Sequence, residues 1–360
     1  MLKRFLLGAA LTVTVVAAIT SPVLAGTIGH VREFPIPTAN SEPRQIAAGP
    51  DGALWFTEFN ASKIGRITTS GAVSEFPTPT ASVFPFDIAA GPDGGVWFTE
   101  SANQIGRLDP TTDAIQELPL PTSGETAHNI TAGPDGAVWF TESAPDAIGR
   151  ITPSGQVSEF QLPPGSGPSD ITTGPDGALW FTEPGNGVIG RMTTSGGLTT
   201  FSGAGFPVSI TTGPDGNLWY TQSFAQAIGR ITPTGQITTF PMPQDGTPMD
   251  ITAGSDGALW FTEFAGQRIG RITTDGLISE SKPKDSPEPE GIAAGPDGNI
   301  WFAEFHANQI GELILPRTPN RSTTRGLTQT PRAGQPQPTR AIHIGSNQLS
   351  HSTHRPRGVL

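Results

Sequence analysis

A pattern of apolar and polar positions repeats along most of this chain. The string GPDGALWFTE at residues 49–58 has near-copies that begin at residues 91, 133, 174, 213, 254 and 295, so successive copies start 39 to 42 residues apart. In each copy a turn-forming segment is followed by a short run of large apolar side chains and then by polar residues. A period of this length is typical of two-helix repeats or of the four-stranded blades of a propeller.

The segments inside each repeat decide between these two architectures. The first repeat divides into RQIAAG, ALWFTE, KIGRIT and AVSEFPTP, four β-compatible stretches separated by turn formers. The chain contains 45 Gly and 36 Pro among 360 residues, spread through every repeat. That density breaks helices and suits tight turns between short strands. We therefore expect an all-β fold over residues 26–315, a seven-bladed β-propeller with four antiparallel strands per blade.

The tryptophans indicate how the blades pack. In ALWFTE, Leu54 and Phe56 point to one face of the strand and Trp55 points to the other. Both faces are apolar, so neighbouring blades must cover both. All seven tryptophans of the chain occupy this slot of the repeat, at 55, 97, 139, 180, 219, 260 and 301. Seven aromatic residues at one equivalent position indicate packing between blades rather than a ligand cage.

The two ends of the repeat region complement each other. The seventh repeat runs through NIWFAE and QIGELIL and stops at Pro316 without a fourth strand. A match to the missing VSEFPTP-type strand, VREFPIP, lies at residues 31–37. We expect this N-terminal strand to complete blade seven, which closes the ring and leaves no exposed sheet edge.

The first 25 residues differ from the repeats. Lys3 and Arg4 precede an apolar run over residues 5–19, and VLA at 23–25 offers small residues for cleavage. This order is typical of a secretory signal peptide, so we expect a secreted, periplasmic or cell-envelope protein. A membrane anchor is the alternative, and the Ser21-Pro22 break disfavours it. No other stretch is apolar enough to span a bilayer, and we expect no membrane span after cleavage.

Residues 316–360 change in composition again. This segment contains seven Arg, no acid and little apolar periodicity, so we expect a disordered basic tail. The whole chain has a net charge of −11, from 21 basic and 32 acidic residues. Without the two bases of residues 1–25 and the seven of the tail, residues 26–315 carry 12 bases against 32 acids, or −20. Such a domain repels phosphate backbones, which excludes nucleic acid as a partner. There is no cysteine, and we expect a monomer stabilised by packing alone.

A candidate ligand site lies just before the first strand of each blade. There the repeats differ from one another, although the scaffold positions agree. In a propeller these positions surround one mouth of the central channel, and variable residues on a rigid scaffold indicate a binding site. Drift at unimportant loops is the alternative. The residues are Arg44, Phe86, His128, Ser169, Val208, Met249 and Glu290.

Acidic residues form a second candidate site. Six second strands end in Glu, at 58, 100, 142, 183, 263 and 304, and we expect these to be structural, capping a turn or pairing with an arginine of the Arg66 type. Blade seven has Glu312 in place of that arginine, so Glu304 would lose its partner. If Glu288, Glu290 and Glu304 converge, they form a site for a hard cation, Mg²⁺ or Ca²⁺.

The recurrent P-x-x-I-T-A-G-x-D-G-x-L-W-F-T-E, I-G-R-I-T and G-x-I-x-E-F-P motifs resemble the virginiamycin B (streptogramin) lyases, which are seven-bladed propellers. The resemblance covers residues 28–315 and every blade. It implies Mg²⁺-dependent elimination that opens cyclic streptogramin B depsipeptides. In this family a base at the mouth removes a proton next to the ester carbonyl, and the metal polarises the substrate. The family base is a His in a seventh-blade E-P-H-G-I motif, assisted by a His in a sixth-blade P-H-A-I motif.

This chain departs from the family motifs at the mouth. Glu290 and Met249 occupy the two His positions, and Arg44 occupies the position of a first-blade aromatic residue in P-Y-G-I. Glu288 and Glu304 match the acids on the metal side. We therefore expect a propeller that binds a small molecule, a peptide or an envelope component at its mouth, with a divalent metal as a further expectation. The alternatives are a Mg²⁺-dependent carbon–oxygen lyase with Glu290 as its base, and an interaction module without a ligand.

Overall fold

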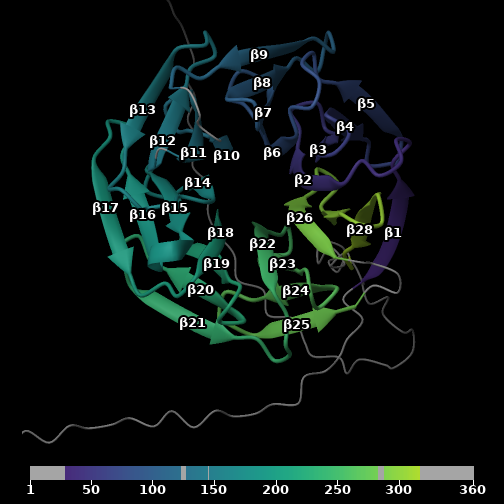
Figure 1. Cartoon of the computed structure of the whole chain (residues 1–360). Helices are drawn as coiled ribbons and strands as arrows, with labels where there is room; N and C mark the ends of the chain where they lie inside the picture. The colour runs from purple at the N-terminus through teal and green to yellow at the C-terminus, as the bar shows by residue number, and fades with distance from the viewer. Residues whose placement is uncertain (1–28, 123–126, 145, 283–287, 317–360) are drawn as a thin grey trace, which may run out of the picture. The chain divides into compact units, whose positions relative to one another are not determined.

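The computed structural model describes residues 29–122, 127–144, 146–282 and 288–316. These residues form 28 strands in seven four-stranded antiparallel sheets. Figure 1 shows the sheets arranged as blades around a central axis, which confirms the predicted seven-bladed propeller. The predicted signal peptide and basic tail lie outside the described residues. In the described part, no helix is long and apolar enough to cross a membrane.

The strands of each blade follow one another from the channel outwards. In blades one to four they are β2 (Pro43–Ala48), β3 (Leu54–Glu58), β4 (Lys63–Ile67) and β5 (Val73–Pro77); β6 (Pro85–Ala90), β7 (Val96–Glu100), β8 (Gln104–Leu108) and β9 (Ile115–Pro119); β10 (Ala127–Ala132), β11 (Val138–Ser143), β12 (Asp146–Ile151) and β13 (Val157–Gln161); and β14 (Ile171–Thr173), β15 (Leu179–Glu183), β16 (Val188–Met192) and β17 (Leu198–Ser202). A 3₁₀ turn, η1 (Pro184–Asn186), follows β15.

Blades five to seven repeat this order, and the last blade takes its outer strand from the N-terminal side. The strands are β18 (Pro207–Thr212), β19 (Leu218–Gln222), β20 (Ala227–Ile231) and β21 (Ile237–Pro241); β22 (Pro248–Ala253), β23 (Leu259–Glu263), β24 (Arg268–Ile272) and β25 (Ile278–Ser281); and β26 (Pro289–Ala294), β27 (Ile300–Glu304), β28 (Gln309–Ile314) and β1 (His30–Pro35).

The tryptophans pack between blades, as the sequence predicts. Trp301 of blade seven shares a buried cluster with Leu54 and Phe56 of blade one, and Trp55 shares one with Phe98 of blade two. All seven tryptophans are at most 1 % exposed. Each buries on the order of 150–250 Å². The continuous core therefore runs around the ring, with one layer between each pair of blades.

The aspartate of the GPDG turn holds its own tryptophan and arginine. In blade one, Asp51 Oδ1 accepts a hydrogen bond from Trp55 Nε1 at 3.0 Å and Oδ2 accepts one from Arg66 Nε at 2.7 Å. The expected pairing of the Arg66-type arginine with the strand-ending glutamate is therefore wrong. Arg66 lies opposite Trp55 in the strand register, whereas Glu58 lies opposite Lys63. The glycine between Ile64 and Arg66 is required because a Cβ on Gly65 would lie 2.1 Å from the Phe56 ring.

Closure by the N-terminal strand is confirmed. Strand β1 pairs antiparallel with β28 from His30 opposite Ile314 to Pro35 opposite Gln309. Phe34 stacks on Trp301 at 5.6 Å, and Arg32 Nη2 lies 2.8 Å from Glu312 Oε2. Other blades have arginine at the position of Glu312 and most have serine or threonine opposite it. Glu312 is negative where the other blades have a positive arginine, and it pairs with the positive Arg32 of the closing strand. The closing strand is therefore complementary in charge to this blade.

The glutamates that end the second strands are buried. Glu58 and Glu100 are fully buried, and burial is the main cause that raises the pKa of each to about 8. Blade five has Gln222 at this position, and its Nε2 donates to the Ala204 carbonyl at 2.7 Å. Glutamine has the shape and the donor of a protonated glutamic acid. Gln222 in place of glutamate is therefore consistent with a neutral, protonated glutamate at this position in the other blades.

These protons make stability depend on pH. The folded chain holds a proton on Glu100 up to pH about 8, whereas an ordinary carboxyl releases it near 4.5. At Glu100 the folded state therefore binds more protons between these values, and the contribution of this group to the free energy of unfolding falls as pH rises through this window. Glu100→Gln should flatten the fall, and its stabilisation relative to wild type should grow from pH 5 to pH 8 in urea unfolding. Gln222→Glu is the matched control and should steepen the fall; identical slopes in all three proteins would contradict the assignment.

Candidate functional site

The first strands of the blades line a pocket with a cavity volume of about 110 Å³. The seven mouth residues predicted from the sequence all line it, so the structure brings that whole set together. The residues that directly follow the mouth residues form a second tier, and five of these seven residues line the same pocket. The pocket residues are Arg44, Gln45, Phe86, His128, Asn129, Ser169, Asp170, Val208, Ser209, Met249, Asp250 and Glu290.

A bulge at the start of the first strand turns both tiers inwards. In blade one the register between β2 and β3 shifts between Pro43 and Ile46, so Arg44 and Gln45 leave the regular ladder. The same shift occurs in five further blades. A bulge re-aims the side chains of the strand that contains it. The bulge ends at the isoleucine that resumes the regular ladder, for example Ile46 opposite Phe56, so it places the two residues before this isoleucine at the pocket.

The threonine of the WFTE motif accepts a hydrogen bond from a backbone N–H of the bulge and donates one to the next blade. Thr57 Oγ1 accepts a hydrogen bond from Gln45 N at 3.0 Å and donates to the Phe86 carbonyl of blade two at 3.1 Å. The corresponding bonds from one blade to the next measure 2.6 to 2.9 Å. We call these residues the latch threonines; they are Thr57, Thr99, Thr141, Thr182, Thr221 and Thr262.

Aspartates in the second tier also connect neighbouring blades. Asp170 Oδ2 accepts a hydrogen bond from Ile210 N of the next blade at 2.7 Å, and Asp250 Oδ2 accepts one from Ile292 N at 2.9 Å. Asp87 makes the corresponding bond to Ile130 N at 2.7 Å. We did not single out these residues from the sequence. The available signal was that the residue after each mouth position is polar or glycine in all seven repeats.

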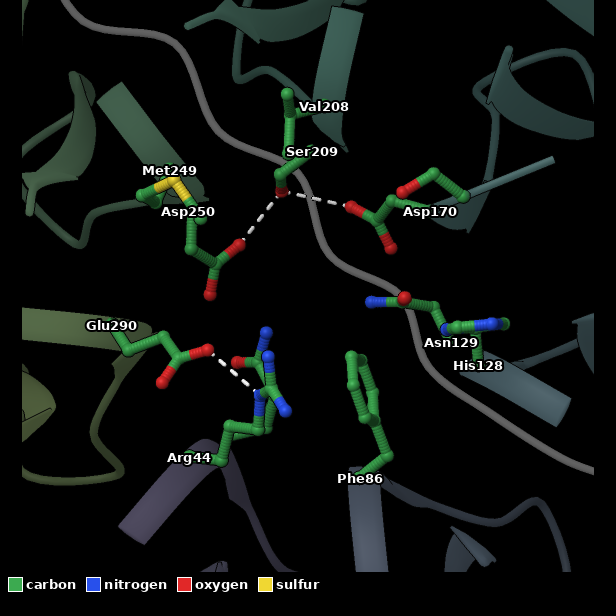
Figure 2. Close-up of a pocket in the computed structure, with 12 residues that line it drawn as sticks. Arg44, Phe86, His128, Asn129, Asp170, Val208, Ser209, Met249, Asp250 and Glu290 are labelled. Atoms are coloured by element: carbon green, nitrogen blue, oxygen red, sulfur yellow. Dashed lines mark hydrogen bonds and ion pairs between the residues drawn. The ribbon is translucent and has the colours of Figure 1, made fainter. Parts of the chain in front are cut away.

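The Ser209 hydroxyl bridges Asp170 and Asp250. The Ser209 hydroxyl lies 2.8 Å from Asp170 Oδ2 and 2.7 Å from Asp250 Oδ1, as Figure 2 shows. The hydroxyl has one hydrogen, so a protonated carboxyl would allow both contacts to be hydrogen bonds. Burial, followed by the charge of Asp250, raises the pKa of Asp170 to about 7. Burial also raises the pKa of Asp250.

On the opposite side of the pocket, Arg44 and Glu290 form an ion pair. Arg44 Nε donates to Glu290 Oε1 at 2.7 Å, and the two residues come from blades one and seven (Figure 2). The Arg44 guanidinium carbon lies 4.1 Å from the centre of the Phe86 ring and 5.0 Å from that of Phe59. Burial raises the pKa of Glu290, and the charge of Arg44 opposes this effect.

Among the seven blade junctions that the structure describes, one lacks both the latch threonine and the aspartate that connect other blades. The ion pair lies at this junction. At the junction of blade seven with blade one, Ala303 replaces the latch threonine and Gly291 replaces the aspartate. Asn308 contributes here as well, because its Oδ1 accepts a hydrogen bond from Ser41 N at 2.7 Å. Arg44 and Glu290 thus stabilise ring closure on the channel side while they line the pocket.

His128 and Met249 complete the predicted ligand-binding set. His128 Nε2 lies 2.9 Å from Ser143 Oγ, and its ring makes an edge contact with Phe86 at 5.2 Å. Burial, with a smaller contribution from the charge of Arg44, lowers the pKa of His128. The imidazole is therefore neutral near pH 7, and Met249 adds an apolar surface from blade six.

The three glutamates proposed as metal ligands have separate partners. Glu290 pairs with Arg44, and Glu288 Oε2 contacts His306 Nδ1. Glu304 is fully buried at the end of β27, opposite Pro289 in the register. Across the described ranges, no group of three or more His, Cys, Asp or Glu side chains is arranged to hold a metal ion. The expected convergence of Glu288, Glu290 and Glu304 is therefore not seen.

The fold and the motifs agree with comparisons to known proteins. The sequence profile of the virginiamycin B lyase family matches residues 17–203 and 101–319. A solved streptogramin B lyase is 40 % identical, with a TM-score of 0.76 over 80 % of this chain and 98 % of that one. This chain belongs to the virginiamycin B lyase family.

Two further family structures come from Staphylococcus aureus. A virginiamycin B lyase is 41 % identical, with a TM-score of 0.75 over 79 % of this chain and 99 % of that one. A catalytically inactive histidine-to-alanine variant with quinupristin is 40 % identical, with the same TM-score and coverage. The propeller of this family member therefore extends over nearly the full length of its solved relatives.

Proposed function

We propose that this member of the virginiamycin B lyase family binds a small molecule, a peptide or a cell-envelope component at the channel mouth without opening an ester. The observation that carries the proposal is the Arg44–Glu290 ion pair. It joins two of the positions at which this chain departs from the family motifs. The pocket combines this pair with aromatic and apolar surface from Phe86 and Met249, a mixture typical of ligand sites.

The ion pair also makes Glu290 a poor general base. A base must be free to accept a proton from the substrate, and its proton affinity must suit that task. One Glu290 oxygen already accepts a charge-assisted bond from Arg44, which occupies that oxygen and lowers its affinity for a substrate proton. Met249 cannot transfer a proton. In the S. aureus relative, the loss of one histidine is described as inactivating, and this chain has no histidine at either motif position.

The second candidate function is a carbon–oxygen lyase that uses Glu290 as its base. Burial favours it, because Glu290 is only 9 % exposed and burial raises its pKa in the direction that a base requires. Such an enzyme would need Arg44 to move away from Glu290 when substrate enters. The linearisation assay described in the Discussion separates this candidate from the binding protein.

Magnesium dependence stays a prediction from the family resemblance. The described side chains do not fit a three-ligand site, because Glu290 is neutralised by Arg44 and Glu288 contacts His306. We therefore assign the metal no part in ligand binding. Export to the periplasm, cell envelope or medium is likewise proposed from residues 1–25 and stays to be tested.

Binding at the mouth can be tested without knowing the natural ligand. We expect a ligand-observed NMR screen of small fragments to give hits that disappear with the double variant Phe86→Ala, Met249→Ala, because both side chains line the pocket. The matched control is Leu277→Ala, an exposed residue in the turn before β25, which should retain every hit. Repeating the screen with Mg²⁺ and with a chelator tests the metal prediction. A screen with no hit that depends on Phe86 and Met249 would favour the interaction module.

A further inference from the structure

Some hydrogen-bonding groups of the pocket already have partners within the protein, and others remain able to bind a ligand. Each oxygen of the buried aspartates already accepts a backbone N–H. For Asp170, Oδ1 accepts from Ile171 N and Oδ2 from Ile210 N, both at 2.7 Å; for Asp250, Oδ1 accepts from Ile251 N at 2.8 Å. These carboxylates hold the blades together. They therefore contribute little to the choice of ligand.

Arg44 provides the open donors. Its Nε is used by Glu290, and within the described part of the chain neither Nη atom has a recorded hydrogen bond. Its side chain is 27 % exposed, and Figure 2 shows the guanidinium between Glu290 and Phe86, facing the cavity. Stacking on Phe86 and Phe59 and the bond to Glu290 fix the guanidinium plane. A guanidinium fixed in this way loses little conformational entropy when it binds a planar anion.

Among the pocket residues, Arg44 is also the only cationic side chain, because burial keeps His128 neutral. The open edge of a guanidinium matches a carboxylate, which accepts two parallel N–H···O bonds. Glu290 offsets the charge of Arg44, whereas burial raises the pKa of Asp170 and of Asp250 and so reduces their repulsion of an anion. The preference for a carboxylate therefore rests on the direction of the open Nη–H donors.

The size of the cavity limits what enters with the anion. A volume of about 110 Å³ is somewhat smaller than the ~150 Å³ cavity that holds benzene. One group of side-chain size therefore fits, and the rest of a larger ligand stays at the mouth. Phe86, Val208 and Met249 provide the apolar walls for that group.

We propose that the pocket selects ligands that carry a carboxylate next to a small apolar group, and that the Nη atoms of Arg44 bind this carboxylate. This inference rests on the proposed binding function. It specifies the chemical class of the ligand. Two kinds of molecule belong to this class: a peptide whose last residue is apolar, and a free aryl or alkyl carboxylic acid.

Isobutyrate and isobutyramide form a matched pair of probes, because they share the small branched alkyl group and differ in the charge. We expect wild type to bind isobutyrate at least about tenfold more tightly than isobutyramide in NMR titrations, since hydrogen bonds to charged groups are stronger than neutral ones. The double variant Arg44→Gln, Glu290→Gln removes the fork without leaving a buried carboxylate unpaired, and it should abolish the preference. Leu277→Ala should retain it. Short apolar peptides with free or amidated C-termini then distinguish a peptide end from a free acid.

The outcomes separate this inference from the proposed function. If isobutyramide binds as tightly as isobutyrate, the carboxylate inference is wrong and the binding function stands. If the preference persists in the double variant, Arg44 is not the carboxylate receptor and the inference is also wrong. If neither probe binds wild type at millimolar concentration while other fragments bind through Phe86 and Met249, only the carboxylate inference fails. If no fragment binds, the proposed function fails with it.

Discussion

Deletion of the closing strand, residues 30–38, should prevent cooperative folding of the whole propeller. The deletion removes Phe34 from Trp301, Ile36 from the cluster between blades seven and one, and the complete ladder to β28. Burial of two such apolar side chains stabilises a protein by about 3–6 kcal/mol, which approaches the ~5–15 kcal/mol of a typical domain. The deletion also exposes β28 as an unprotected edge. Differential scanning calorimetry should show a large decrease in Tm or no cooperative transition.

A peptide with the sequence of residues 30–38 provides the control for this deletion. Added in excess, it should bind β28 and raise the Tm with its concentration, as expected for any ligand of the native state alone. A peptide with Arg32→Glu should rescue less well, because its carboxylate would face Glu312. An unchanged Tm after the deletion would show that the ring is stable without closure.

Streptogramin B linearisation by the wild-type protein should be at least about a hundredfold slower than by a family enzyme with both histidines. One positioned general base contributes roughly 10²–10⁴ in rate. Here Glu290 is held by Arg44, and Met249 replaces the second histidine. The measurement is the rate of quinupristin opening in the presence of Mg²⁺, followed by chromatography of the product.

The structure decides which variants should recover activity. Met249→His with Glu290→His leaves Arg44 unpaired beside the new base and lowers its proton affinity, so this double variant should gain little. Adding Arg44→Tyr removes the charge and introduces an aromatic residue, as the family motif has there. The triple variant should therefore exceed the double variant by at least about tenfold, because one unit of pKa corresponds to a tenfold change in protonation equilibrium. Wild-type turnover comparable to that of family enzymes would show that Glu290 is a working base.

The mouth residues illustrate how much of the site could be predicted. The seven variable positions were identified because each stands just before the predicted first strand of its blade, where the repeats differ although their scaffold positions agree. Their convergence on one pocket follows from the symmetry of a propeller. Their contacts do not, because Arg44 and Glu290 are 246 residues apart and meet only after the ring closes.

The acidic residues show the opposite case. The sequence alone does not show which acidic residue the Arg66-type arginine contacts. The predicted pairing with the Glu58-type glutamate was wrong. The antiparallel register places Arg66 opposite Trp55 and near Asp51, three positions away from the strand-ending glutamate. A shift of this size along a strand carries a side chain about 10 Å away, which is beyond the reach of an ion pair.

The sequence by itself determined the period, the approximate positions of the strands, the interblade role of the tryptophans and the identity of the closing strand. These features depend on local turn chemistry and on alternation along single strands, which repeat in every blade. Only the tertiary structure decided the charge partners: Arg66 with Asp51, Arg44 with Glu290, and Asp170 with Asp250 through Ser209. Such contacts depend on distances of a few ångströms between different strands and blades. Bulges and the packing of neighbouring sheets set those distances, and no pattern within one repeat records them.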